Sequence, residues 1–165
     1  MNITDNDAAW IRESLTKSGY FQLFAQGESD KFLNGLMKKS YTPGAKIIVE
    51  GDTNDFVYLV RSGEVRVEVH RQGKDIPVCV LGEGHLFGEI AVVERGHRIA
   101  TVAAVTSVEV YLMFREDFRK VLDRNPALKV RLKELMDRRI KETEQVAAAN
   151  DSFLGALKKR LFKSE

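Results

Sequence analysis

The chain has 165 residues, of which 44% are hydrophobic and 30% are charged, so it can bury one ordinary hydrophobic core. Its formal net charge of +2 is too small to indicate a nucleic-acid-binding protein by bulk electrostatics. We find no helix-turn-helix or zinc-finger pattern in it, which favours a single domain with helical flanks and no DNA-binding domain.

The single cysteine and the three histidines exclude further kinds of site. Cys79 is the only cysteine and lies inside the apolar run IPVCVL, so a disulfide framework and a cysteine-based zinc site are excluded. The three histidines are too scattered to indicate a metal site. Because there is neither a signal-peptide pattern nor a run of roughly 18 apolar residues, we expect a cytoplasmic protein with no transmembrane segment.

Residues 1–40 show the spacing of helices. Apolar residues recur there three and four positions apart, in two groups: Trp10, Ile11 and Leu15, then Phe32, Leu33, Leu36 and Met37. Ser29 or Asp30 is placed to cap the second group. We therefore expect two short amphipathic helices at the N-terminus.

Residues 41–114 change to a period of two, which is typical of strands. EVRVEVH (64–70) alternates apolar and polar residues, and AKIIVE, FVYLV, IPVCVL, IATVAAV and VEVYLM are similar runs separated by turn signals. Six or more short strands joined by glycine turns predict a sandwich or barrel. The expected fold class is mainly β: a jelly-roll β-barrel, or double-stranded β-helix, with N-terminal and C-terminal flanking helices.

Residues 115–149 return to helical spacing. Asn125-Pro126 ends one short helix, and Pro126 suits the first position of a longer helix over about 127–149. That helix has one apolar stripe, so it must pack on something. Its stripe consists of Leu128, Leu132, Leu135, Met136 and Ile140.

Residues 150–165 are expected to form a separate basic amphipathic tail, because AAAND weakens the preceding helix. Phe153, Leu154, Leu157 and Leu161 share one side of it. A basic amphipathic helix can bind a membrane surface or a partner groove. We favour packing of the tail on its own domain or on a second copy of the chain, which allows a homodimer through the C-terminal helices.

The stretch FGEIAVVERGHRIATV (87–102) inserts charges and glycines between two apolar runs. Gly88 permits a tight approach, and the helical turn after it offers the free N–H groups of Ile90 and Ala91 to an anion. Glu89 suits a sugar hydroxyl, and Arg98 suits phosphate oxygens. Taken alone, this Glu and Arg would be a surface ion pair, but together with the amides they describe a site for a ribose phosphate.

These sixteen residues resemble the phosphate-binding cassette of the cyclic-nucleotide-binding domain family, which includes kinase regulatory subunits, CRP-type regulators and channels. The pattern F-G-E-(I/L)-A, a short loop, then R-(A/S/T)-A-(T/S)-V is matched by residues 87–91 and 98–102. Residues 41–69 are similar to the first half of the family's barrel. The resemblance covers about residues 20–145.

The resemblance implies that Glu89 accepts from the ribose 2′-hydroxyl, that Arg98 pairs with the cyclic phosphate, and that the helix at 127–149 is a lid over the base. It also implies that Gly88, Ala91 and Ala100 line the pocket. The predicted ligand-binding residues are Phe87, Gly88, Glu89, Ile90, Ala91, Arg98, Ile99, Ala100 and Thr101.

Two departures from the family pattern bear on the ligand. Arg95-Gly96-His97 replaces the Gly-x-Pro that many members have, and Ile99 replaces the small or hydroxylated residue after the arginine. A threonine there favours cyclic GMP in channel-like cassettes, so Ile99 favours cyclic AMP. No cofactor is expected.

The function that we expect is a stand-alone, non-enzymatic sensor that relays occupancy to an unknown protein effector. The alternative is a vestigial fold that works as an interaction scaffold without nucleotide. An enzyme is disfavoured, because the sequence shows neither clustered histidines nor a nucleophile with its base.

Overall fold

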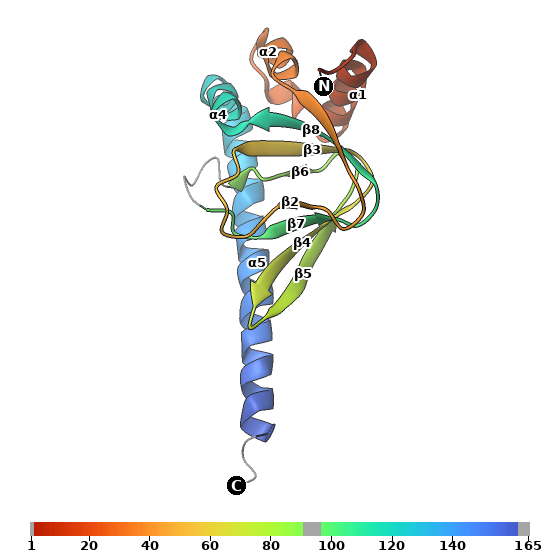
Figure 1. Ribbon diagram of the computed structural model, residues 1–165. Helices are drawn as coiled ribbons and strands as arrows, with labels where there is room; N and C mark the ends of the chain where they lie inside the picture. The colour runs from red at the N-terminus through yellow and green to blue at the C-terminus, as the bar shows by residue number, and fades with distance from the viewer. Residues whose placement is uncertain (1, 91–96, 162–165) are drawn as a thin grey trace.

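The computed structural model describes residues 2–90 and 97–161, with side chains as far as residue 151. Its helices are α1 (Asp5–Lys17), the 3₁₀ helix η1 (Phe21–Leu23), α2 (Glu28–Asn34), α4 (Arg115–Arg124) and α5 (Pro126–Leu161). Its strands are β1 (Met37–Tyr41), β2 (Lys46–Ile48), β3 (Phe56–Ser62), β4 (Val65–Arg71), β5 (Lys74–Leu81), β6 (Leu86–Phe87), β7 (Thr101–Ala104) and β8 (Val108–Phe114). In Figure 1, α1, α2 and α4 lie at the top of the view, above β8 and β3, and α5 runs down past the strands.

The described strands form two four-stranded antiparallel sheets, in the orders β1-β8-β3-β6 and β2-β7-β4-β5. Strands that follow each other in the chain often belong to different sheets, as β7 and β8 do, so the connections cross from one sheet to the other. This is the two-sheet arrangement of a jelly roll. The predicted fold class is confirmed.

The space between the sheets is filled by the inward residues of the alternating strands. Val60, Val65 and Val110 are completely buried there, and Tyr58 stacks on Phe87 with their ring centroids 4.8 Å apart. Fully burying a side chain of this size contributes roughly 1.5–3 kcal/mol. Because Phe87 directly precedes Gly88, this packing also fixes where the cassette begins.

The N-terminal helices form as expected, but their boundaries differ from the prediction. Thr4 caps α1 through a capping box with Asp7. The cap of α2 is Gly27 in the left-handed region, at φ 77°, and neither Ser29 nor Asp30 serves as that cap. Met37 belongs to β1 and pairs with Leu112 of β8, so strand structure begins at residue 37 and not at 41.

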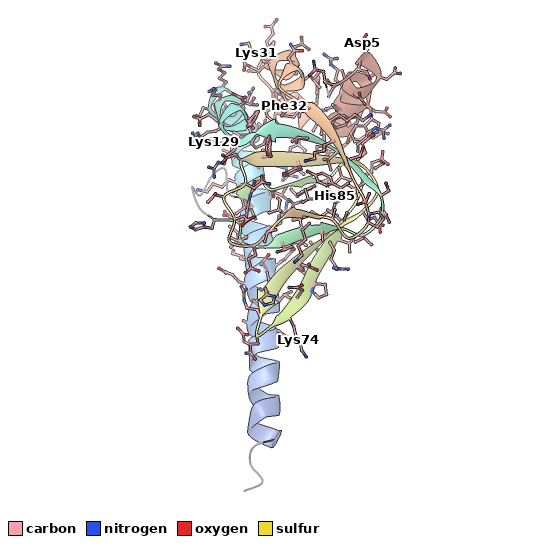
Figure 2. The ribbon with its side chains drawn as sticks, in the orientation of Figure 1. Asp5, Lys31, Phe32, Lys74, His85 and Lys129 are labelled. Atoms are coloured by element: carbon pink, nitrogen blue, oxygen red, sulfur yellow. The ribbon has the colours of Figure 1, made fainter. Side chains whose placement is uncertain are left out.

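A second apolar cluster joins the helices to the outer face of the β1-β8-β3-β6 sheet. Ile11 of α1, Phe32 of α2, Leu59 of β3, Phe118 of α4 and Leu132 of α5 are all buried in it. Figure 2 shows Phe32 on the side of α2 that faces the sheet. The helices are therefore fixed to the sheet by an apolar core of their own.

Asp7 ties α1 to this sheet through polar contacts. One of its carboxylate oxygens accepts hydrogen bonds from the Tyr111 hydroxyl (2.7 Å) and Lys38 Nζ (3.0 Å). The other oxygen accepts from the backbone N–H and the hydroxyl of Thr4, both at 2.8 Å. Burial by itself raises the pKa of Asp7, but these four hydrogen bonds outweigh it and hold the pKa well below its usual range.

Asn125 organises the junction between α4 and α5. It is 1% exposed, its side-chain Nδ2 donates to the Val121 carbonyl (2.6 Å), and its Oδ1 accepts from the Ala25 N–H (2.5 Å). Pro126 then opens α5, as the sequence predicts. One side chain thus ends a helix and attaches it to the N-terminal segment.

The helix α5 continues where the sequence predicted a break. It runs without interruption through 36 residues, which corresponds to about 54 Å, and in Figure 1 it extends past the β4–β5 hairpin. The predicted separation of a lid helix (127–149) from a tail (150–165) is therefore wrong for the backbone as far as Leu161. No helix among the described residues is long and apolar enough to cross a membrane.

Candidate functional site

A cavity of about 70 Å³ lies between the β2-β7-β4-β5 sheet, the cassette and α5. Cassette residues 87–90 and 98–100 line one side of it. The sheet contributes an apolar wall made of Ile48, Val67, Val78, Cys79, Leu81 and Val102, and α5 contributes Arg139, Glu142 and Thr143. The cavity therefore combines an apolar wall with charged groups from two separate parts of the chain.

Gly88 lets the backbone make the turn that opens the cassette. Its φ of +78° is a conformation that favours glycine. A Cβ at this position would lie 3.1 Å from each of three atoms: Arg98 Nη1, Ile48 Cδ1 and the carbonyl oxygen of Phe56. The tight approach that the sequence predicts is confirmed, and it brings the backbone against the guanidinium of Arg98.

Arg98 is 4% exposed, and oxygen atoms of neutral groups surround its guanidinium. Nη1 donates to the Gly88 carbonyl at 2.6 Å. Nη2 donates to the Asn54 and Phe56 carbonyls, at 2.7 and 2.5 Å, and to the Asn54 side-chain Oδ1 at 3.1 Å. Three backbone carbonyls and one amide therefore position this cation.

The charge of Arg98 has no counter-ion among the described residues. Its Nε is buried and has no hydrogen-bond partner there, and no carboxylate forms an ion pair with it. Burial lowers the pKa of Arg98 from its usual value. A buried cation without a counter-ion is costly, so the site suits an anion.

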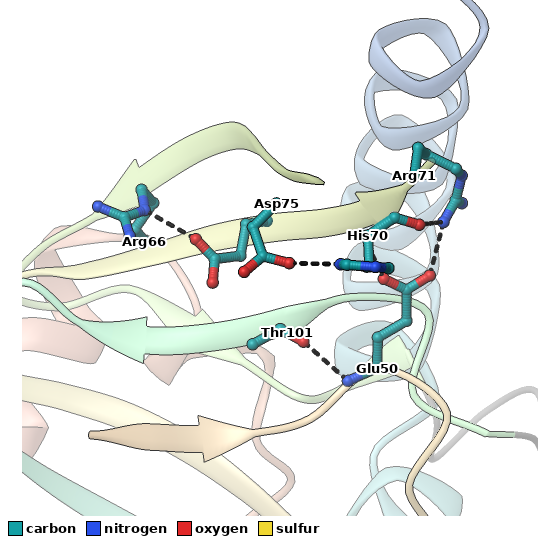
Figure 3. A network of polar contacts seen from close by, with 7 residues as sticks. Glu50, Arg66, His70, Arg71, Asp75 and Thr101 are labelled. Atoms are coloured by element: carbon teal, nitrogen blue, oxygen red, sulfur yellow. Dashed lines mark hydrogen bonds and ion pairs between the residues drawn. The ribbon is translucent and has the colours of Figure 1, made fainter. Parts of the chain in front are cut away.

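The β2–β3 loop beside Arg98 is held in place by hydrogen bonds to β4 and β7 of the β2-β7-β4-β5 sheet. The Glu50 carboxylate accepts from the His70 N–H and from Arg71 Nη1, both at 2.7 Å. Its backbone N–H donates to the Thr101 hydroxyl at 2.9 Å. Figure 3 shows these contacts linking the loop to β4 and β7.

Glu89 is 2% exposed and forms an ion pair with Arg139 of α5. The same Nη1 of Arg139 donates to the Leu86 carbonyl at 2.6 Å. Arg139 is largely buried as well, with 18% of its side chain exposed. A charge-assisted hydrogen bond of this kind is stronger than a neutral one, so it holds α5 against the cassette.

The remaining polar groups of the cavity are few. The hydroxyl of Thr143 donates to the Arg139 carbonyl at 2.8 Å, one turn back along α5. Cys79 is a free thiol whose pKa is raised by burial, which keeps it protonated and unreactive. No three His, Cys, Asp or Glu side chains among residues 2–90 and 97–151 cluster closely enough to hold a metal ion.

The structure brings together most of the residues that the sequence singled out. Residues 87–90 and 98–100 line the cavity. Thr101 does not line it: this residue is buried, and its hydroxyl accepts the Glu50 N–H in a structural contact. Ala91 lies outside the described residues.

Sequence reasoning missed Asn54 and Arg139. Asn54 lies 44 residues from Arg98, and Arg139 lies 50 residues from Glu89. The family resemblance implied that the helix at 127–149 covers the site, but it did not indicate which of the helix's charged residues points inward. Only the three-dimensional packing shows these two contacts.

The chain is similar to regulatory proteins of known sequence. The sequence profile of the cyclic nucleotide-binding domain matches residues 38–125. The cyclic AMP receptor protein of Thermus thermophilus is 34% identical over 128 residues, which are 77% of this chain and 59% of that protein. A cAMP-dependent protein kinase regulatory subunit of Yarrowia lipolytica is 36% identical over 95 residues, 58% of this chain and 25% of the subunit.

Solved structures show the same likeness. The catabolite activator protein of Thermus thermophilus superposes with a TM-score of 0.63 at 33% identity, over 81% of this chain and 60% of that one. The cAMP-bound structure of PfPKA-R gives a TM-score of 0.68 at 30% identity, over 73% of this chain and 43% of that one. This chain thus spans less than two thirds of each of these proteins. Because the profile covers more than half of its length, the chain belongs to the cyclic nucleotide-binding domain family.

Proposed function

We propose that this chain is a sensor module that binds a cyclic nucleotide, with cyclic AMP as the preferred ligand. The observation that carries the proposal is the buried guanidinium of Arg98, which finds no counter-ion and no partner for its Nε among the residues that the structure describes. A cyclic phosphate supplies one negative charge and the acceptor oxygens that such a cation needs. The apolar sheet wall suits the base and the sugar ring.

In this proposal, Glu89 binds the ribose. Arg139 occupies one of its carboxylate oxygens, Oε1, and a carboxylate has acceptor positions on both oxygens, so it can accept a 2′-hydroxyl as well. The nucleotide and α5 then share one carboxylate. Binding of the ribose changes how firmly Glu89 holds Arg139, which passes occupancy from the cassette to α5.

The cavity, with a volume of about 70 Å³, is small for a nucleotide. Arg139, Glu142 and Thr143 form its α5 side, so an outward movement of α5 enlarges it. A nucleotide that binds more tightly when α5 has moved outward increases the fraction of molecules in that conformation. This shift is the relay that we propose.

The output of the module is proposed to be α5 itself. The helix extends past the β4–β5 hairpin, and the sequence of its last part repeats leucines at helical spacing. Such a helix suits contact with a second copy of the chain or with a protein effector. We place this non-enzymatic sensor in the cytoplasm, which agrees with its single free thiol.

The small cavity and the Glu89–Arg139 ion pair also fit a second function, in which the pocket is vestigial and α5 acts as a scaffold. Calorimetric titration of the nucleotide-stripped protein with cyclic AMP, and then with cyclic GMP, separates the two. The sensor predicts micromolar or tighter binding, with cyclic AMP the tighter ligand. Absence of heat with both nucleotides, from a folded sample, would refute a sensor for these two ligands and leave a vestigial pocket or one tuned to another nucleotide.

A further inference from the structure

Asn54 connects the β2–β3 loop to the cation of the site. Its Oδ1 accepts from Arg98 Nη2 at 3.1 Å and from the Phe56 N–H at 2.9 Å. Its Nδ2 donates to the Tyr58 hydroxyl at 3.0 Å. Tyr58 is 2% exposed and stacks on Phe87, so the amide is held in one orientation by the core between the sheets.

Among the described residues, two carboxylates act on Arg98 through their charges, and both are bound to other arginines. Glu89 forms an ion pair with Arg139. Asp55, the neighbour of Asn54 in the chain, forms an ion pair with Arg115 at 2.8 Å. Both carboxylates raise the pKa of Arg98 through their charge, but burial outweighs them and the net shift is downward. The cation is thus surrounded by groups that orient it without neutralising it.

The charge of the side chain at position 54 therefore bears directly on whether Arg98 is neutralised. An aspartate has nearly the same shape as asparagine, and it would place a carboxylate oxygen at the 3.1 Å position next to Nη2. A carboxylate at that distance neutralises the guanidinium and competes with an anionic ligand for it. The neutral amide gives the same geometry without that competition.

We propose that Asn54 is a positioning residue of the anion site, which orients Arg98 through a neutral oxygen and leaves its positive charge to the ligand. The inference rests on the proposed function, because it takes the ligand to be a cyclic nucleotide. It extends that function by making the affinity for cyclic AMP depend on a neutral side chain at position 54 as well as on Arg98.

The test compares Asn54→Asp with Asn54→Ala by calorimetric titration with cyclic AMP and by thermal unfolding of the nucleotide-free protein. Asn54→Asp keeps the shape and adds the charge, so cyclic AMP affinity falls by roughly tenfold or more. Asn54→Ala loses the orientation but stays neutral, so affinity falls by only about threefold. The two variants should rank the other way in thermal stability. Asn54→Asp should unfold at a higher temperature than Asn54→Ala, because Asp retains a partner for Arg98 and Ala does not.

Thr53→Asp is the matched control, since Thr53 is exposed on the same loop and the variant adds the same charge one residue away. It should change affinity by less than about twofold, because a charge in water is screened. A purely structural role for Asn54 gives the opposite order, with Ala more harmful to binding than Asp. That order, an unfolded Asn54→Asp variant, or an equal effect of Thr53→Asp would overturn the inference.

The proposed function can fail separately. If the wild-type protein binds no cyclic nucleotide, the sensor proposal is lost, whereas the thermal order of the Asp and Ala variants still reports whether Arg98 lacks a counter-ion. If the wild-type protein binds and the two variants bind equally, the sensor stands and the role of Asn54 is wrong.

Discussion

Asp7 of α1 and Arg98 of the cassette are both more than nine-tenths buried, but within residues 2–90 and 97–151 only Asp7 has an oppositely charged partner. Asp7 accepts four hydrogen bonds, one of them from the cation of Lys38. The hydrogen-bond acceptors of Arg98 in the described part of the chain are all neutral oxygens, and its Nε has no partner there. Under the proposed function, the difference separates a charge that holds the fold together from a charge that binds a ligand.

The comparison predicts that mutations at the two sites act on different properties. Loss of Asp7 should reduce the free energy of unfolding and leave ligand affinity nearly unchanged. Loss of Arg98 should reduce affinity far more than stability, because its removal also relieves the cost of burying an unmatched cation.

The largest expected effect is that of Arg98→Ala on ligand binding. Removing one partner of a buried, hydrogen-bonded charge pair costs about 2–5 kcal/mol, which weakens cyclic AMP binding by roughly 30- to 5,000-fold. Calorimetric titration measures it. Arg12→Ala is the control, because Arg12 belongs to an exposed pair with Asp30 and its loss removes the same charge. An affinity for the Arg98 variant within threefold of wild type would refute the assignment.

Asp7→Asn should lower the free energy of unfolding by about 2–3 kcal/mol, because an amide nitrogen then faces N–H or O–H donors in place of one carboxylate oxygen. Urea unfolding at pH 7 measures the loss. Cyclic AMP affinity of the folded variant should stay within about twofold of wild type. A variant as stable as wild type would show that the four contacts of Asp7 contribute nothing net.

The contribution of Asp7 should also depend on pH. Its pKa is lowered in the folded protein, so its stabilisation is fully present well above the unfolded pKa of 3.8 and is lost as the pH falls toward the folded pKa. The stability difference between wild type and Asp7→Asn should therefore shrink between about pH 5 and pH 2. Urea unfolding across this range checks it; a constant difference would contradict the lowered pKa.

Arg139→Ala should release α5 from the cassette. Loss of its bonds to Glu89 and Leu86 should speed hydrogen exchange of α5 backbone amides near residue 139 by about tenfold, or roughly 1.4 kcal/mol. Exchange there should no longer respond to cyclic AMP. The control is Arg131→Ala, because Arg131 lies exposed on the same helix. If exchange in Arg139→Ala still responds to ligand as in wild type, Arg139 is not the relay.

The smallest expected effect is that of Glu89→Gln on cyclic AMP binding. The binding free energy should weaken by about 1 kcal/mol, because the amide keeps one oxygen that accepts a 2′-hydroxyl. The informative measurement is the affinity for 2′-deoxy cyclic AMP relative to cyclic AMP. The wild-type protein should lose more affinity for the deoxy analogue than the variant does. Equal losses in both proteins would argue against ribose recognition by Glu89.

The cassette could be predicted from the sequence because its parts are close together in the chain. Gly88, Glu89 and Arg98 lie within eleven consecutive residues, 88–98, and the left-handed φ of Gly88 follows from the turn that this spacing requires. Strands such as β4 could be predicted as well, since alternation is a local signal.

Other features of the structure depend on packing, or contradict a prediction made from local sequence. The strand β1 (MKKSY) has no apolar alternation, and only its pairing with β8 makes it a strand. The sequence AAAND (147–151) predicts a weakened helix, but alanine is the strongest helix former, and α5 continues through this stretch. Asn54 and Arg139 reach the site from distant positions, which no local pattern can indicate.

The central claim is that the unmatched charge of Arg98 exists for a cyclic nucleotide. The most direct measurement is the shift in thermal midpoint that saturating cyclic AMP produces in the wild-type protein and in Arg98→Ala. A ligand at about a thousand times its dissociation constant stabilises the folded state by about 4 kcal/mol, so the wild-type midpoint should rise clearly and the variant's should hardly move. Equal shifts in the two proteins, or no shift in the wild type, would contradict the account.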